Sequence, residues 1–193
     1  MINTIPHHFY SIIDPPNKKD LLFLLESTNL STDNTPDWVN HCNIKFERVE
    51  INQDLWDTLY PSLDIFFREV NLNIQNLKLS INDIWKNTYK EGFFQEVHDH
   101  LPLHLSGVIF LTDEQEDDGK FFFFNQYASE VSKEWRDIGL SAQKNYVKSE
   151  RGKILLFPSY MLHGVSMHKT NNPRKTIAFN IEFNTSIPLK HPY

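Results

Sequence analysis

Apolar positions divide the chain into a first half with helical spacing and a second half with short strand-like runs. In the first half, apolar residues recur every three or four positions across residues 19–26 and again across residues 53–77, which predicts two amphipathic helices. Pro61 lies inside the second stretch, and we expect it to break or restart that helix, because proline has no backbone N–H. This pattern predicts a helical part over about residues 1–80.

The second half alternates short runs rich in Phe, Ile, Leu and Val with Gly, Pro, Asp and Asn. The predicted strands cover residues 83–89, 93–97, 105–111, 120–124, 152–157, 162–167 and 175–183. Many short strands with turn residues between them are typical of a β-sandwich or barrel. Residues 125–147 form a longer mixed segment, expected to be an insertion with a short helix or a flap over a site. The whole chain is therefore predicted to be one α+β domain, mainly β, with its β core over about residues 81–185.

Composition limits which binding partners and which cellular compartment are expected for this chain. The chain has 193 residues, 40% of them hydrophobic, which suits one soluble domain with a sizeable core. The net charge of −6 disfavours nucleic acid as a partner, because a phosphate backbone is usually bound by a basic face. No stretch approaches the roughly 20 apolar residues that cross a bilayer, so no membrane association is expected. Cys42 is the only cysteine, and together with the lack of a secretory signal it favours a cytoplasmic location.

Histidines supply the first candidate chemistry. His98, Asp99 and His100 are consecutive at the end of a predicted strand, and His163 lies between two strand-like runs much later in the chain. Because side chains two apart on a strand share a face, His98 and His100 can meet one ion, whereas Asp99 points away unless the strand ends there. Two histidines and a carboxylate on a β-barrel are the usual ligands of non-haem iron(II) oxygenases. His104 is not expected to be a ligand, because Pro102 separates it from the pair. The other histidines are interpreted as surface or core residues: His7, His8, His41, His168 and His191.

Arg174 opens a run that alternates cleanly to residue 183. One face is apolar, and the other carries Arg174, Thr176, Ala178, Asn180 and Glu182. A polar strand face is either exposed to solvent or lines a polar pocket, and the upstream histidines favour the pocket. A buried guanidinium can hold a carboxylate through two parallel hydrogen bonds, and a hydroxyl two residues along the strand can add a third.

In their order and spacing, seven stretches resemble the 2-oxoglutarate/iron(II) oxygenase superfamily. The closer likeness is to its prolyl-4-hydroxylase-like branch, and within that to small proteins common in marine bacteria and their phages. The likeness covers about residues 85–184, in the stretches 85–89, 95–100, 105–111, 119–121, 157–159, 163–165 and 174–180. It implies a double-stranded β-helix, or jelly-roll, core.

The resemblance also implies roles for single residues. His98 and His163 match the two metal-binding histidines of the family. Arg174, assisted by Thr176, matches the residue that holds the distal carboxylate of 2-oxoglutarate, and Tyr89 stands where a tyrosine reaches the same co-substrate. Phe110 replaces a second tyrosine found in several relatives. Two residues are expected near the substrate: Asn180, on the pocket face of the last strand, and Trp135, in the 125–147 segment.

The third metal ligand departs from the family pattern, which places an acid two residues after the first histidine. Here that position is His100, and the acid, Asp99, comes one residue earlier. Charge favours Asp99, since a carboxylate would partly neutralise iron(II). Geometry favours His100, because using Asp99 requires a bulge or turn directly after His98. The predicted ligand set is His98, His100 and His163, with Asp99 as the alternative third ligand.

The function implied by the resemblance is hydroxylation of a C–H bond with iron(II), 2-oxoglutarate and O2, releasing succinate and CO2, with ascorbate as an added reductant. Peptidyl proline is the first expected substrate, and a small molecule is the alternative. One rival interpretation is a metal-binding, cupin-like jelly roll without oxygenase activity, and Arg174 with Thr176 argues against it. Another is a non-enzymatic accessory protein of a phage or bacterium, which failure to bind any divalent metal would support.

Overall fold

The computed structural model describes residues 8–27, 30–31, 42–43, 45–127, 132–138 and 142–185. Its strands are β1 (Ser11–Ile13), β2 (Leu30–Ser31), β3 (Cys42–Asn43), β4 (Lys45–Val49), β5 (Leu77–Tyr89), β6 (Phe94–His98), β7 (Leu105–Phe110), β8 (Phe121–Phe124), β9 (Lys144–Val147), β10 (Ile154–Pro158), β11 (His163–Val165) and β12 (Arg174–Thr185). Its helices are α1 (Lys18–Ser27), α2 (Gln53–Glu69) and α3 (Lys133–Asp137), with a 3-10 turn, η2, at Ile74–Asn76.

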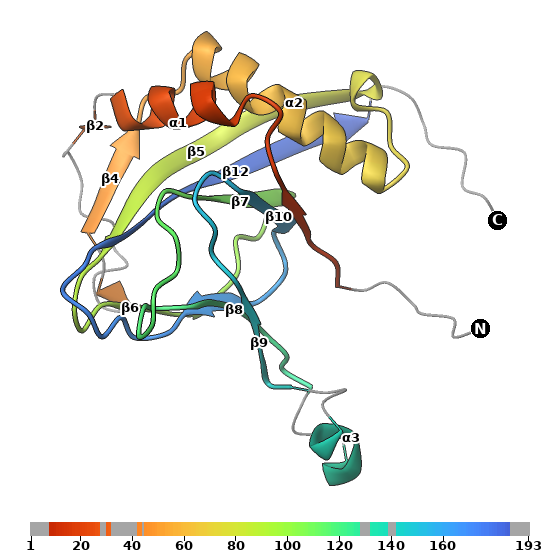
Figure 1. Cartoon of the computed structure of the whole chain (residues 1–193). Helices are drawn as coiled ribbons and strands as arrows, with labels where there is room; N and C mark the ends of the chain where they lie inside the picture. Colours follow the sequence, from red (N-terminus) through yellow and green to blue (C-terminus); the bar gives the residue numbers. More distant parts are fainter. Residues whose placement is uncertain are drawn as a thin grey trace.

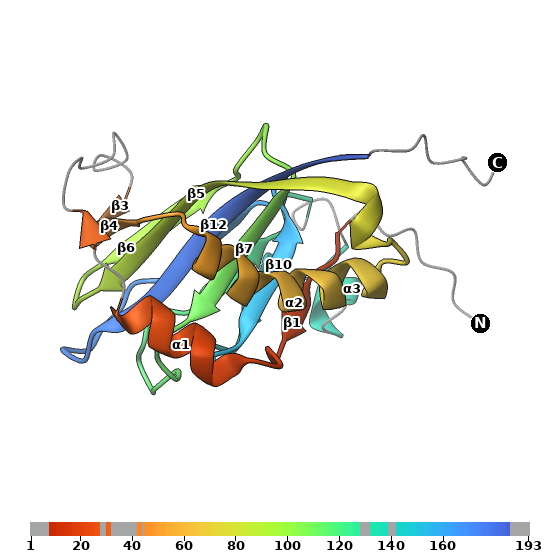
Figure 2. The same cartoon turned by 90° about the horizontal axis from the view of Figure 1, so that it is seen from above.

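Two antiparallel sheets face each other, and α1 and α2 cover the outer face of the larger sheet (Figures 1 and 2). The larger sheet has the order β1-β10-β7-β12-β5-β4-β2, and the smaller one the order β3-β6-β11-β8-β9. One apolar cluster lies between the helices and the larger sheet, and a second, rich in phenylalanine, lies between the sheets. The jelly-roll prediction is confirmed.

Helix α2 shows how packing overrides a local helix breaker. The helix runs through Pro61, so the expectation that Pro61 breaks or restarts it is wrong. The N–H that proline lacks would bond to the carbonyl of Asp57, an exposed residue whose carbonyl can turn to solvent. Leu59 and Leu63 on either side are buried under the sheet, and this packing stabilises the helix against its proline. The helix also ends at Glu69, earlier than the predicted residue 77.

The first part of the chain is only partly helical, contrary to the prediction for residues 1–80. β1 adds an edge to the larger sheet by pairing with β10, and β4 pairs with β5, which itself begins at Leu77. β1 is three residues long and β4 five. Segments this short carry too few positions for a period of two to emerge from the sequence.

β12 is a central strand with a different neighbour on each side. It pairs with β5 along its whole length and with β7 from Thr176 to Ile181. Its alternation is the predicted one: Ile177, Phe179 and Ile181 are buried against the helices. Arg174, Thr176 and Asn180 are also buried, each at most 3% exposed, so the polar face points between the sheets and not to solvent.

The segment 125–147 contains a short helix, as one of the two predicted alternatives had it. Figure 1 shows α3 beyond the ends of β8 and β9, projecting away from the sheets. Among the helices of the described residues, none is long and apolar enough to cross a membrane.

Candidate active site

Three imidazoles gather at one end of the smaller sheet. His98 ends β6 and His163 begins β11, and the two residues are directly paired across these antiparallel strands. His100 follows two residues after β6 ends, and its Nε2 lies 3.2 Å from Nε2 of His163. One ring nitrogen from each of the three lies within 4.8 Å of the others. The structure therefore brings together the three histidines that the sequence suggested as ligands.

Asp99 is directed elsewhere by a local turn. The strand ends at His98, and Oδ1 of Asp99 accepts a hydrogen bond of 3.0 Å from the backbone N–H of Leu101. The prediction that His98 and His100 share one continuous strand is therefore wrong, because the turn begins after His98. The turn nevertheless delivers His100 to the same site. His104, next along the chain, lies apart from the cluster, since its Nδ1 accepts the backbone N–H of Phe183 at 3.0 Å.

The three imidazoles are neutral at physiological pH, which suits metal binding. Burial lowers the pKa of His100 to about 4, and burial also lowers the pKa values of His98 and His163, the latter well below its ordinary value. In His98 and His163, Nδ1 donates 2.8 Å hydrogen bonds to the backbone carbonyls of Glu96 and Met161. Each Nε2 is then unprotonated and can offer its lone pair to a metal ion. A cluster of such imidazole nitrogens fits iron(II) and related first-row ions.

Arg174 lies at the start of β12, 2% exposed. Its guanidinium carbon is 4.9 Å from the ring centroid of Tyr89, and Nη2 donates to Oγ of Ser149 at 3.5 Å. Within the described residues, Nε and Nη1 have no hydrogen-bond partner. Burial lowers the pKa of Arg174 from its ordinary value, and Tyr89 opposes that shift. Buried donors without partners are costly, and a carboxylate would satisfy both of these.

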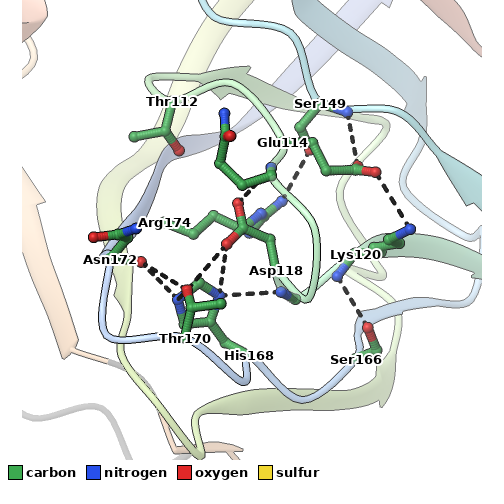
Figure 3. Close-up of polar contacts among 12 residues, drawn as sticks. Thr112, Glu114, Asp118, Lys120, Ser149, Ser166, His168, Thr170, Asn172 and Arg174 are labelled. Atoms are coloured by element: carbon green, nitrogen blue, oxygen red, sulfur yellow. Dashed lines mark hydrogen bonds and ion pairs between the residues drawn. The ribbon is translucent and has the colours of Figure 1, made fainter.

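A polar network behind Arg174 fixes the loop that leads into β12 (Figure 3). His168 is fully buried, with Nδ1 accepting the N–H of Gly119 at 3.1 Å and Nε2 donating to the carbonyl of Asn172 at 2.7 Å. Asp118 accepts the backbone N–H of Gln115 at 2.8 Å and the hydroxyl of Thr170 at 3.3 Å. Of the surface and core positions expected for this histidine, the structure shows the core one.

A single cavity connects the histidine cluster to Arg174. Thr176 and Tyr89 line it beside the arginine, and Trp85 and Asn180 line it beside His100. Gln95 bridges the two ends: Tyr89 Oη donates to Gln95 Oε1 at 3.0 Å, and Gln95 Nε2 lies 3.4 Å from Nε2 of His98. The space open to water-sized molecules is about 20 Å³, and Gln95 lines it between the two ends.

Other predicted residues are placed as follows. Phe110 is fully buried in the apolar cluster between the sheets. Trp135 belongs to α3, and its side chain lies outside the described part of the structure. His8 is exposed, whereas His7, His41 and His191 are outside the described residues.

Sequence reasoning missed four residues around the site: Gln95, Ser106, Ser149 and Ser159. Ser106 and Ser159 share a 2.9 Å hydrogen bond, and Ser106 Oγ also donates to Oδ1 of Asn180 at 2.8 Å. Gln95 stands three residues before His98, and this closeness was the one available signal. The serines lie on segments distant in sequence and give no comparable signal, because only the fold brings these segments together.

Several solved structures share this fold. The viral collagen prolyl hydroxylase of Paramecium bursaria Chlorella virus-1, solved with 2-oxoglutarate, is 13% identical, with a TM-score of 0.58 over 90% of this chain and 95% of that one. A Pseudomonas putida prolyl-4-hydroxylase is 15% identical, with a TM-score of 0.58 over 91% and 94%. HygX of Streptomyces hygroscopicus, solved with nickel, 2-oxoglutarate and hygromycin B, is 13% identical, with a TM-score of 0.59 over 90% and 82%. At these identities the likeness establishes the fold.

The sequence itself matches a family model. No curated protein matches the chain. The model described as "Putative 2OG-Fe(II) oxygenase" matches residues 83–180, just over half of the chain. The matched region runs from β5 to β12 and contains the three clustered histidines and Arg174. This chain therefore belongs to the family of 2-oxoglutarate- and iron(II)-dependent oxygenases.

Proposed function

We propose that this oxygenase hydroxylates a C–H bond of its substrate, with iron(II) held by His98, His100 and His163 and 2-oxoglutarate held by Arg174. The observation that carries the proposal is the single cavity with three neutral imidazoles at one end and a buried guanidinium at the other. The imidazoles suit a divalent metal, and the guanidinium suits the carboxylate of an acid bound to that metal.

The residues around the cavity have separate tasks. Arg174 pairs with the distal carboxylate, and the hydroxyls of Thr176 and Tyr89 supply further hydrogen bonds to it. Phe121, Phe157 and other apolar side chains line the cavity and keep water away from the bound acid. When bound, iron(II), 2-oxoglutarate and O2 supply the oxidising chemistry that converts C–H to C–OH and yields succinate and CO2. The protein positions these reactants and excludes competing reactions.

The substrate would approach from the side of His100. A hollow of about 290 Å³ there shares Trp85, Gln95, His100 and Asn180 with the cavity. Its outer wall contains Phe46, stacked on Trp85 with ring centroids 5.7 Å apart. Aromatic faces offer an apolar surface to a proline ring, so a proline-containing peptide is the first substrate to test. The HygX structure with hygromycin B makes a small polar molecule the second.

Succinate formation tests the proposal. Purified protein is incubated with iron(II), ascorbate, 2-oxoglutarate and O2, with and without proline-rich peptides or aminoglycosides, and succinate is measured. We expect succinate release that a true substrate accelerates, and product 16 Da heavier by mass spectrometry.

The control separates bound metal from oxygenase chemistry. Arg174→Met should retain metal binding and lose succinate release, whereas Arg68→Met, at an exposed arginine of α2 that lines neither the cavity nor the hollow, should keep both. Metal binding by wild-type protein without succinate under any condition would favour the metal-binding jelly roll without oxygenase activity.

A further inference from the structure

His100 differs from the other two histidines in what its Nδ1 faces. The Nδ1 atoms of His98 and His163 face backbone carbonyls, which can only accept, so the ring proton of each is fixed on Nδ1. Nδ1 of His100 instead lies 3.3 Å from the side-chain amide of Asn180. An amide presents a donor on one edge and an acceptor on the other, so it can stabilise either tautomer of His100.

With Asn180 as it stands, the contacts place the proton of His100 on Nε2. Nδ2 of Asn180 donates to Nδ1 of His100, and Nε2 of His100, 3.2 Å from Nε2 of His163, donates to that unprotonated nitrogen. Oδ1 of Asn180 accepts from Ser106. Every contact in this chain has one donor and one acceptor. However, a protonated Nε2 cannot bind a metal.

The serines allow the whole chain to reverse. Ser106 Oγ lies between Asn180 and the hydroxyl of Ser159, 2.9 Å away, and either hydroxyl of that pair can donate. If the amide turns by half a rotation, Nδ2 donates to Ser106, Ser106 donates to Ser159, and Oδ1 accepts from Nδ1–H of His100. The reversed chain keeps the hydrogen bonds that link His100, Asn180, Ser106 and Ser159 and gives up only the one between the two Nε2 atoms, so Nε2 of His100 is left unprotonated toward the other two imidazoles.

Because the network is buried, its hydrogen bonds determine which ring nitrogen of His100 carries the proton. Asn180, Ser106 and Ser159 are 3%, 2% and 0% exposed, so water cannot easily replace a missing partner. The backbone carbonyl of Ser159 also accepts the backbone N–H of His100 at 2.9 Å, so the last residue of this network is bonded directly to His100.

We propose that Asn180 is the positioning residue that selects the metal-binding tautomer of His100, by turning its amide so that Oδ1 accepts the proton on Nδ1. Ser106 and Ser159 reverse their hydroxyls to follow it. The ring proton moves from Nε2 to Nδ1 by exchange with solvent, so the imidazole stays neutral and the proton count is unchanged. The inference rests on the proposed metal site, and it concerns a contact outside the ligands themselves.

The tautomer is directly measurable by NMR. Nitrogen-15 shifts of the histidine ring distinguish the two tautomers, with zinc(II) as a diamagnetic probe. We expect the proton of His100 on Nε2 without metal and on Nδ1 with zinc(II), while His98 and His163 keep it on Nδ1 in both conditions. A proton on Nδ1 of His100 in both conditions would overturn the proposed change of tautomer.

Metal affinity provides the second readout, by calorimetry with iron(II) under anaerobic conditions. Asn180→Leu removes the acceptor and should weaken binding about 10–100-fold, the usual effect of losing a group that orients a ligand histidine. Asn180→Asp can only accept, so it should fix the proton on Nδ1 and bind at least as tightly as wild type. Asn17→Leu is the matched control, a half-buried asparagine outside the cavity whose Nδ2 donates to the carbonyl of Thr58 at 3.0 Å, and it should leave the affinity unchanged.

The outcomes separate this inference from the proposed function. If wild-type protein binds no iron(II), the metal site itself is wrong. If wild type binds and Asn180→Leu binds equally well, only the role of Asn180 is wrong. Should Asn180→Leu not fold, the comparison of Asn180→Asp with wild type decides: weaker binding by the aspartate variant contradicts the role of an acceptor.

Discussion

Replacing Arg174 with methionine should make the protein more stable and unable to bind 2-oxoglutarate. The guanidinium is 2% exposed, and Nε and Nη1 lack partners within the described residues. Each unsatisfied buried donor costs about 1–3 kcal/mol, so their removal returns roughly 2–6 kcal/mol. Against this stand the contact with Tyr89, about 1–2 kcal/mol, and a long hydrogen bond to Ser149, about 1 kcal/mol. Taken at the midpoints of these ranges, the net expectation is a gain of about 1–2 kcal/mol, and methionine keeps most of the apolar volume.

The assay is urea unfolding followed by circular dichroism, with nickel(II) in place of iron and with or without 2-oxoglutarate. At 100 times its dissociation constant, the co-substrate should stabilise wild-type protein by about 2.7 kcal/mol and should not stabilise Arg174→Met. Arg48→Met, at a side chain 57% exposed, is the matched control and should change stability by less than about 0.5 kcal/mol. If Arg174→Met is less stable than wild type, or is still stabilised by 2-oxoglutarate, the view that the guanidinium is buried in order to bind a carboxylate is refuted.

Three further predictions concern the histidines and the sheet. His163→Ala should abolish iron(II) binding in calorimetry, and His100→Ala should weaken it far more than Asp99→Ala. If Asp99→Ala weakens binding more than His100→Ala, the third metal ligand is Asp99. Gly107→Ala should destabilise the fold by about 1–3 kcal/mol in urea unfolding, since its Cβ would lie 2.2 Å from the ring of Phe179; a neutral effect would mean that the ring can move. Without metal, the free energy of unfolding should fall as the pH drops from 6.5 towards 4. In that range the unfolded chain binds a proton at His100, whereas the folded chain, with the pKa of His100 lowered to about 4, does not. This histidine alone accounts for about 3 kcal/mol at pH 4, and a free energy of unfolding that stays constant over the range would contradict the burial of the imidazole.

Long, regular segments of the sequence were the ones that predicted structure and site together. β12 has twelve residues with strict alternation, so both its apolar face and the pocket face with Arg174 and Thr176 could be identified beforehand. β1 and β4 were missed because they are too short to show a period and are held by pairing with strands distant in sequence. A proline penalty also misled the prediction for α2, because the burial of a whole helix face outweighs one missing hydrogen bond.

The histidines and the arginine of the candidate site could be predicted from the sequence, and the residues that support them could not. The spacing of His98 and His100 indicated a shared site, and the family resemblance added His163 and Arg174. The contact of Asn180 with Ser106 depends on the register between β12 and β7, which places these two residues directly opposite each other. That register is set by the packing of two strands, and no local pattern around either residue encodes it.

The two faces of β12 have a consequence for how the chain finds its native pairing. A slip of one residue against β5 and β7 would turn Arg174 and Asn180 into the apolar layer beneath the helices, and Ile177 and Phe179 into the polar cavity. Burying a guanidinium and an amide among leucines and phenylalanines is far more costly than any single mispaired hydrogen bond. The polar groups on this face thus also help to select the native register during folding, because they make the nearest wrong register strongly unfavourable. Variants that remove several of them at once should fold more slowly or into mixtures, even where each single change is stabilising.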